Sequence, residues 1–279
     1  LVGSEMCIRD RLKTLKKDEA QFYADIWDSI SPFIKIGAME DEKFAEQVKE
    51  IILYSTTKNT SADNEDNNEL IKSGSKTFTT LDAYKNRLTD ENKKVLYSTD
   101  EVSQSTALNM WTSQGKEVLK LDTVIDTQFI PWLEEKNKEI NFVRVDSELD
   151  ESIKDDSPEI ADKDGNTKSE TLKKMISSAL NNEKVTVQVQ SLKGENSPPS
   201  LILLPEQMRR INDITALMEQ KLPGLPEYHN LIVNSNHPLI QGLLKLNSNP
   251  IVIELSLIHI SEPTRRYAIS YAVVCVKKK

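Results

Sequence analysis

The stretch from residue 115 to residue 148, GKEVLKLDTVIDTQFIPWLEEKNKEINFVRVDSE, constrains the fold of this chain more than any other part. Short apolar runs at 118–121 and 142–145 frame a segment whose apolar side chains recur at helical spacing. Two strands joined through a helix lie parallel, because the helical crossover returns the chain to the end where the first strand began. With a strand and a helix before it, this unit predicts a small α/β domain over residues 77–148, with a parallel sheet of about three strands.

The strand ends of this unit carry acidic residues. Ligands of open α/β layers usually bind at the carboxyl ends of the strands, where this sequence places Asp122, Asp126 and Asp146. No glycine-rich turn accompanies them, which argues against a phosphate cradle. Aspartates in such places are more often caps than catalytic carboxylates, and no partner base or nucleophile is in sight. We therefore expect no catalytic site in this chain.

The helix of the same unit contains Pro131. Proline cannot donate a hydrogen bond in a helix interior, so we expect the helix to begin near Thr127 or Gln128. Phe129 and Ile130 would then lie in a loosely held first turn.

The N-terminal part is predicted to be helical. One apolar stripe there has helical spacing and consists of Leu12, Leu15, Phe22, Ile26 and Ile30, widened by Tyr23 and Trp27. We interpret this stripe as core rather than as a binding face, and we expect Ser31-Pro32 to end or kink the helix. A second helix follows in MEDEKFAEQVKEIILY, whose first turn is acidic.

The C-terminal part is predicted to be an α+β arrangement. The expected elements are a helix at 169–180, strands in KVTVQVQSL and SLILLP that run antiparallel, an amphipathic helix at 206–221, a strand in HNLIVNSN, and a helix capped near Asn236. His229 and His237 are poor metal candidates, because neither a cysteine nor a third ligand accompanies them.

Two longer strings resemble a known family. LDTVIDTQFIPWLEEKN with FVRVDSELDE resembles the middle domain of the bacterial heat-shock protein 90 (HtpG) chaperones. LLPEQMRRINDITALMEQKLPGLPEYHNLIVNSNHPLI resembles the start of that family's C-terminal domain. The resemblance covers nearly all of residues 12–254 and implies a piece of the middle domain followed by the start of the C-terminal domain.

The resemblance also implies a function. Members of the family are ATP-driven, homodimeric chaperones of the cytoplasm, and they bind unfolded or partly folded proteins, called clients. This stretch would lack the nucleotide-binding domain and the dimer helices, so we expect a monomer that needs no cofactor, although ATP and Mg serve the parent protein. The client-binding residues implied by the resemblance are Phe129, Trp132, Met208, Ile211 and Met218.

The two ends of the chain look foreign. Residues 1–11, with MCIRDR, and residues 255–279, with SLIHISEPTR, resemble translated sequencing-adapter read-through. Both cysteines, Cys7 and Cys275, fall in these ends, so no disulfide is expected. The expected divisions are a foreign tail at 1–11, a helical connector at 12–54, a polar linker at 55–76, the α/β domain at 77–148, an acidic linker at 149–168, a truncated α+β domain at 169–254, and a foreign tail at 255–279.

Two other functions remain open from the residues alone. A formal charge of −8 argues against a nucleic-acid surface, and no apolar run reaches the roughly 18 residues of a membrane helix. A small α/β domain could still bind a nucleotide or another small molecule, although fold class does not decide function. A structural connector without any ligand is the second alternative.

Overall fold

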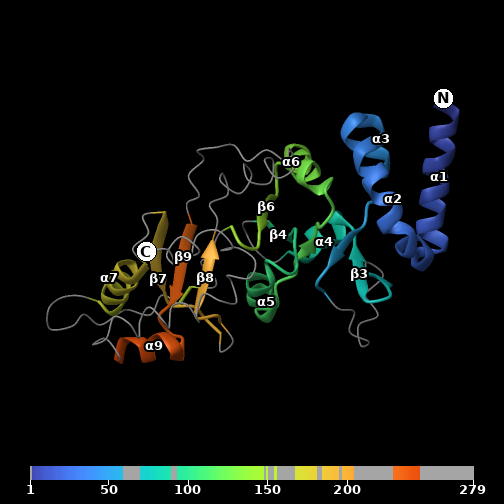
Figure 1. Cartoon of the computed structure of the whole chain (residues 1–279). Helices are drawn as coiled ribbons and strands as arrows, with labels where there is room; N and C mark the ends of the chain where they lie inside the picture. Colours follow the sequence, from blue (N-terminus) through green and yellow to red (C-terminus); the bar gives the residue numbers. More distant parts are fainter. Residues whose placement is uncertain are drawn as a thin grey trace, which may run out of the picture. The chain divides into compact units, whose positions relative to one another are not determined.

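The computed structural model describes residues 2–58, 70–88, 93–147, 149, 154–155, 167–180, 184–194, 197–203 and 229–245, with the backbone alone for residues 2–9. They belong to two compact units (Figure 1). Unit 1 comprises Leu1–Glu101 and Lys116–Arg144, and unit 2 comprises Val102–Gly115 and Val145–Lys279. We describe each unit by itself.

Unit 1 begins with three helices, α1 (Val2–Asp18), α2 (Ala20–Glu40) and α3 (Glu42–Val48). The prediction that the helix ends at Ser31-Pro32 is wrong, because α2 continues through Pro32 and the helical chain is interrupted at Glu19 instead. The alternative, a kink at Ser31-Pro32, stays a prediction. A proline inside a helix costs about 3 kcal/mol. Residues on both sides of Pro32 are buried in one core, and that burial offsets the cost.

The start of α3 has the predicted acidic first turn, with Glu42, and a side-chain cap at Asp41. The Asp41 side chain accepts hydrogen bonds from the backbone N–H groups of Lys43, at 2.8 Å, and Phe44, at 3.3 Å. Such a cap satisfies donors that a helix start otherwise leaves unpaired. The helix then ends at Val48, so the buried Ile51 and Ile52 lie beyond it and not on its face.

A six-stranded sheet with two further helices completes unit 1. Its elements are β1 (Tyr54–Thr56), β2 (Ile71–Ser73), β3 (Lys76–Thr79), α4 (Leu81–Arg87), β4 (Lys94–Ser98), β5 (Leu119–Lys120), α6 (Asp126–Lys136) and β6 (Asn141–Arg144). The strand order is β2-β3-β1-β5-β4-β6. The pairs of β4 with β5 and with β6 are parallel, which confirms the predicted parallel core.

The other half of this sheet was not predicted. Strands β1, β2 and β3 pair antiparallel with one another, and β1 also pairs antiparallel with β5. The expected linker at 55–76 therefore contains strands, and the sheet is mixed and not purely parallel. These strands have only three or four residues each and are rich in Ser, Thr and Lys. Hydrogen bonds from distant segments, and not local apolar alternation, determine their conformation.

The helices and the sheet share one core. Buried side chains come from α2, from the turn after α3, from α4 and α6, and from strands in both halves of the sheet. The largest fully buried members include Tyr23, Phe78, Tyr97, Leu119 and Phe129. The fold class predicted from the sequence, an α/β layer beside a helical layer, is thus confirmed for unit 1.

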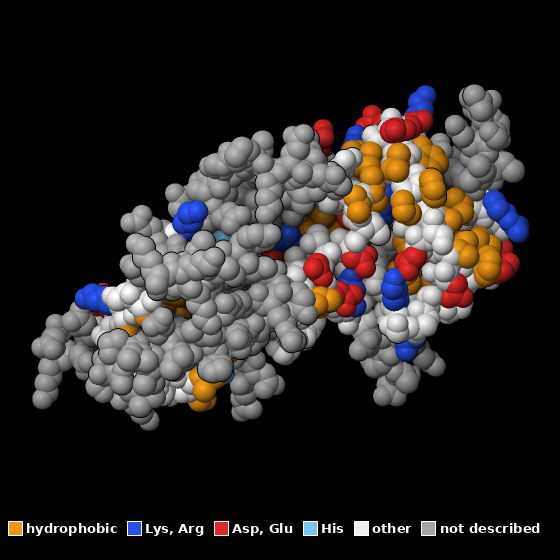
Figure 2. Space-filling view, in the orientation of Figure 1, with side chains coloured by type: hydrophobic (Ala, Val, Ile, Leu, Met, Phe, Trp, Pro, Cys, Tyr) orange, Lys and Arg blue, Asp and Glu red, His pale blue; other side chains and the backbone are white. Residues whose placement is uncertain are grey.

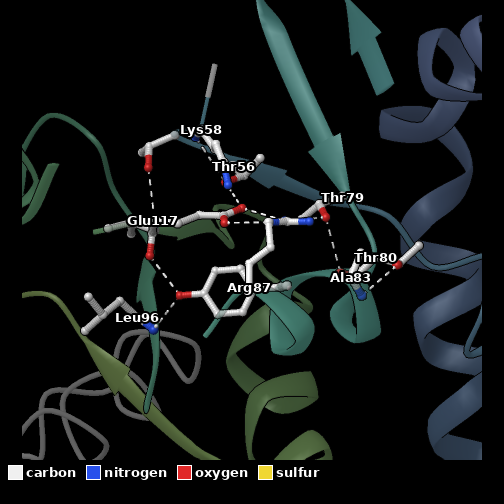
Figure 3. Close-up of polar contacts among 11 residues, drawn as sticks. Thr56, Lys58, Thr79, Thr80, Ala83, Arg87, Leu96 and Glu117 are labelled. Atoms are coloured by element: carbon white, nitrogen blue, oxygen red, sulfur yellow. Dashed lines mark hydrogen bonds and ion pairs between the residues drawn. The ribbon is translucent and has the colours of Figure 1, made fainter. Parts of the chain in front are cut away.

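A half-buried polar cluster joins the antiparallel strands to the parallel ones (Figure 3). Arg87, at the end of α4, donates from Nε and Nη2 to the two carboxylate oxygens of Glu117, at 3.0 and 2.9 Å. The same Nη2 donates to Thr79 of β3, and Thr56 of β1 donates to Glu117. Tyr84 donates to the Glu117 carbonyl at 2.8 Å. This bidentate pair with its hydroxyl partners fixes β1, β3 and α4 around one carboxylate.

We predict that Glu117→Gln lowers the free energy of unfolding by about 1–3 kcal/mol, because the Arg87 guanidinium then faces an amide that cannot accept both of its donors. Urea denaturation measures the effect. Glu46→Gln is the matched control, since it removes a carboxylate from the Lys49–Glu46 pair, whose side chains are more than half exposed. Equal midpoints for the two variants would show that the cluster does not stabilise unit 1.

Unit 2 contains a three-stranded sheet with three described helices. Its described elements are α5 (Ser105–Ser113), α7 (Lys168–Leu180), β7 (Val185–Gln190), β8 (Ser200–Leu203), β9 (His229–Asn234) and α9 (Pro238–Lys245). The strand order is β7-β9-β8. Strand β8 runs antiparallel to β9, and β7 runs parallel to β9. The predicted antiparallel direction of β7 and β8 is therefore right, but the two strands are not neighbours.

Strand β9 is the central strand of this sheet. Leu231, Ile232 and Val233 are consecutive and all buried, as expected for a central strand with both faces covered. In β7 only Val187 is fully buried, and Thr186 and Gln188 are exposed. Leu172 and Ile176 of α7 pack with Ile240 and Leu243 of α9 in the same core.

The start of α9 is capped by His237, one residue after Asn236, which confirms a cap near Asn236. The His237 carbonyl accepts from the Gln241 N–H at 3.0 Å, and its ring Nδ1 accepts from the Leu239 N–H at 3.2 Å. Asn236 instead donates to Asp155. Burial lowers the pKa of His237 below its ordinary value of 6.5. A neutral ring suits this place, because only an unprotonated Nδ1 can accept the helix donor.

We predict that His237 makes unit 2 sensitive to acid. Because the folded pKa lies below 6.5, the unfolded chain binds the proton more readily, so stability is full above pH 6.5 and falls as pH drops toward the folded pKa. His237→Asn keeps a capping side chain that does not titrate. As the pH is lowered from 8 to about 5, the free energy of unfolding of the variant should therefore increase relative to that of the native chain. Urea denaturation at each pH measures these free energies. If both proteins lose the same free energy of unfolding as the pH falls, the His237 ring does not make unit 2 sensitive to acid.

Candidate binding surface

The expected client-binding residues fall into two groups. Met208, Ile211 and Met218 lie outside the described residues. Phe129 and Trp132 lie on α6, where Trp132 is partly exposed and Phe129 is fully buried. The expectation that Phe129 contributes to an exposed apolar patch is therefore wrong.

Phe129 lies on the buried side of α6, which begins one residue before the predicted start near Thr127. The helix starts at Asp126, and the Phe129 N–H donates to the Ile125 carbonyl at 3.0 Å, so the first turn is regular and not loosely held. The Phe129 ring stacks on Trp132 with centroids 5.2 Å apart, and the Lys35 ammonium lies 5.7 Å from its centroid. The buried Phe129 ring thus packs against the core side of the partly exposed Trp132 ring.

Asp126 is the strand-end aspartate with the clearest role. Its carboxylate accepts from the N–H and the hydroxyl of Thr123, at 3.1 and 2.6 Å, and so caps the loop, as the sequence suggested. It also receives the Lys35 ammonium of α2 at 2.6 Å, with both side chains almost completely buried. The sequence did not predict this ion pair, because the two residues stand 91 positions apart.

We predict that Lys35→Met destabilises the protein by about 3–5 kcal/mol, because it leaves the buried carboxylate of Asp126 without a counter-ion. Lys35→Met combined with Asp126→Asn should recover about 1–3 kcal/mol of this loss, since the amide still accepts from Thr123 and carries no charge. A double-mutant cycle by chemical denaturation measures the coupling. Additive losses would mean that the two charges do not depend on each other.

The main exposed apolar surface of unit 1 lies on α2. Phe22 is 51% exposed, Phe33 76% and Ile36 39%, and Ile26 between them is partly exposed. Their spacing places all four on one side of the helix. The opposite side carries the buried Tyr23, Trp27, Ile34 and Ala38. Figure 2 shows apolar side chains gathered over α2 and α3. We call Phe22, Ile26, Phe33 and Ile36 the α2 face.

Two residues of the α2 face, Phe22 and Ile26, were predicted to belong to the core, and that prediction is wrong for Phe22. The signal for the correct assignment was present, because α2 is apolar on two sides and a helix can bury only one of them against a single layer. Tyr23 and Trp27 define the core side, and Phe22 lies outside it.

The other large apolar side chains that are exposed in the described ranges stand singly. They are Val102, Val124 and Leu239, and each belongs to a different segment. Single exposed apolar residues are ordinary on protein surfaces, whereas several on one helix face indicate an interaction surface. The α2 face is therefore the strongest candidate site among the described residues.

Over the described ranges, no three His, Cys, Asp or Glu residues are grouped so that they could hold a metal ion. In the same ranges no helix has the length and apolar character to cross a membrane.

The comparisons with known proteins identify the family. The model of the Hsp90 protein family matches residues 5–250. The chain belongs to the Hsp90 family. The Hsp90 match includes α2, α6 and the segment with Met208 and Met218, and it ends before residue 255. Whether residues 1–11 and 255–279 are foreign stays a prediction.

Curated relatives of this Hsp90 chain are bacterial chaperones. The chaperone protein HtpG of Porphyromonas gingivalis is 30% identical over 254 residues, which cover 85% of this chain and 34% of that protein. The chaperone protein HtpG of Bacteroides thetaiotaomicron is 27% identical over 252 residues, with the same coverage. The chain thus spans about a third of the length of the curated relatives it matches.

Among solved structures, the middle domain of a heat shock protein of Plasmodium falciparum matches the Hsp90 chain with a TM-score of 0.37 and 19% identity. The match covers 49% of this chain and 52% of that one.

Proposed function

We propose that this Hsp90 chain binds unfolded or partly folded client proteins, and that the α2 face is one of its contact surfaces. The observation that carries the proposal is the exposure of Phe22, Phe33 and Ile36 on one side of a helix whose other side is buried. Unfolded proteins expose apolar segments. Covering such a segment with the α2 face removes apolar area from water on both partners, at about 25 cal/mol per Å².

The anchoring of α2 makes its exposed side suitable for binding. Tyr23 and Trp27 are fixed in the core of unit 1, and the Tyr23 hydroxyl donates to the Ile51 carbonyl at 3.0 Å. Lys35 is fixed by Asp126. Because the helix is already ordered, little conformational entropy is lost on its side when a client binds. Only the client segment has to be ordered.

The client-binding residues implied by the family resemblance remain in the proposal, but Phe129 has a different role in it. We propose that Trp132 contributes its partly exposed ring to client contact and that Phe129 serves as its buried support. Met208, Ile211 and Met218 remain proposed members of a second surface on the amphipathic segment at 206–221. Methionine suits such a surface because its side chain adapts to different partners.

The action of the whole protein is also part of the proposal. We propose that the full-length chaperone is a homodimer in the cytoplasm, driven by ATP with Mg, as the family resemblance implies. In this view the present stretch supplies client-binding surface and no catalytic group. By itself it would be a monomer.

We predict that Phe33→Ser combined with Ile36→Ser weakens the suppression of a model protein's aggregation, measured by light scattering, by about threefold or more. The fold should be retained, because the Phe33 side chain is 76% exposed and contributes little to the core. Circular dichroism and urea denaturation check the fold of the variant.

Val124→Ser is the matched control. Val124 is 73% exposed but lies in the loop before α6 and not on the α2 face. This variant loses an exposed apolar side chain of unit 1 and should keep full aggregation suppression. If both proteins suppress aggregation as well as the native chain, or if both are weakened equally, the α2 face is not the client surface.

A further inference from the structure

We propose that the α2 face selects cationic apolar segments, that is, client segments whose apolar side chains are flanked by Lys or Arg. This inference rests on the proposed function, because it names the class of client segment that the same surface takes. The argument comes from the charges that border the α2 face.

Acidic side chains mark both ends of the α2 face. Glu19 precedes the helix and Glu40 is its last residue, and both are exposed. At 100° per residue they lie on the same side of the helix as Phe22 and Phe33. Between residues 19 and 50 the sequence has eight acidic and three basic residues. The single basic residue of α2, Lys35, is buried and neutralised by Asp126.

The two end carboxylates differ from the other acids of α2. Asp28 pairs with Lys76 at 2.5 Å, and Asp25 accepts from Ser73 at 2.6 Å. Within the part of the chain that the structure describes, neither Glu19 nor Glu40 has a salt-bridge partner. They are thus available to a charged group of a partner.

Glu40 also occupies an unfavourable place for a carboxylate. It stands in the last turn of α2, where the unpaired carbonyl groups give the helix end a partial negative charge, and no basic residue is present in that turn. A Lys or Arg side chain from a bound segment would offset this repulsion. A carboxylate from a bound segment would increase it.

The spacing defines the segment that fits. From Phe22 to Ile36 the helix rises about 21 Å, and from Glu19 to Glu40 about 31 Å, at 1.5 Å per residue. A helical segment with about four apolar turns and a basic residue just beyond each end would match both distances. The order along the surface is thus one acid, the apolar stripe, and a second acid.

A second copy of this chain fits the α2 face less well. In antiparallel pairing, Glu19 of one copy would lie near Glu40 of the other, because the apolar stripe is centred close to Ser29. In parallel pairing, each glutamate would lie near its own counterpart. Both arrangements bring like charges together and are therefore disfavoured.

The test uses the full chain and two fluorescent peptides of about 20 residues with the same amphipathic apolar sequence. One peptide has two Lys residues at each end, and the other has two Glu residues. We expect the Lys peptide to bind about tenfold more tightly in fluorescence anisotropy at low salt. The advantage should shrink at about 0.5 M salt, where exposed charges are screened.

Charge-reversal variants locate the effect. Glu19→Lys combined with Glu40→Lys should reverse the preference between the peptides. The control, Asp82→Lys combined with Glu135→Lys, makes the same change in net charge at exposed positions of α4 and α6 and should keep it. If the control reverses the preference as well, the selection follows net charge and the inference is overturned.

Phe33→Ser combined with Ile36→Ser separates this inference from the proposed function. If the variant binds both peptides more weakly than the native chain, and the native chain binds the two peptides equally well, client binding at the α2 face stands and the charge selection is wrong. If the variant changes the binding of neither peptide, the α2 face is not the binding surface, and both proposals fail.

Discussion

Lys35 and Asp126 are nearly sequestered from water, and the Nζ and Oδ1 atoms lie 2.6 Å apart. A buried charge without its partner costs several kcal/mol, so this ion pair favours the packing of α2 on α6 that brings the two groups together. The Thr123 donors hold the carboxylate from the sheet side, and the Phe129 ring lies under the ammonium. These contacts therefore fix where the helical layer of unit 1 packs on its α/β layer.

This fixed position explains why the α2 face is exposed. Tyr23 and Trp27 point into the core together with Lys35, so Phe22 and Phe33 are left on the outside. An exposed apolar stripe costs free energy in water and persists only where the core on the other side stabilises the helix. A rigid stripe of this kind suits the proposed client binding, because a client segment would then be recognised by its apolar character and not by its sequence.

The charges around the stripe add a second level of selection. Apolar contact alone does not distinguish one unfolded segment from another, whereas in our proposal Glu19 and Glu40 at the two ends favour segments with basic flanks. Electrostatic complementarity at the rim of an apolar surface affects the rate of association and the choice of partner more than the total affinity. The selection is therefore expected to depend on salt concentration.

The sequence by itself determined the parallel strands, the strands of unit 2 and the resemblance to the family, because each depends on local periodicity or on a contiguous string. It did not determine β1 to β3, whose short polar segments become strands only by pairing with distant ones. It also misplaced Phe129 and Phe22. Which side of a doubly apolar helix is buried depends on contacts such as Lys35 with Asp126, and residues 91 positions apart meet only in the tertiary structure.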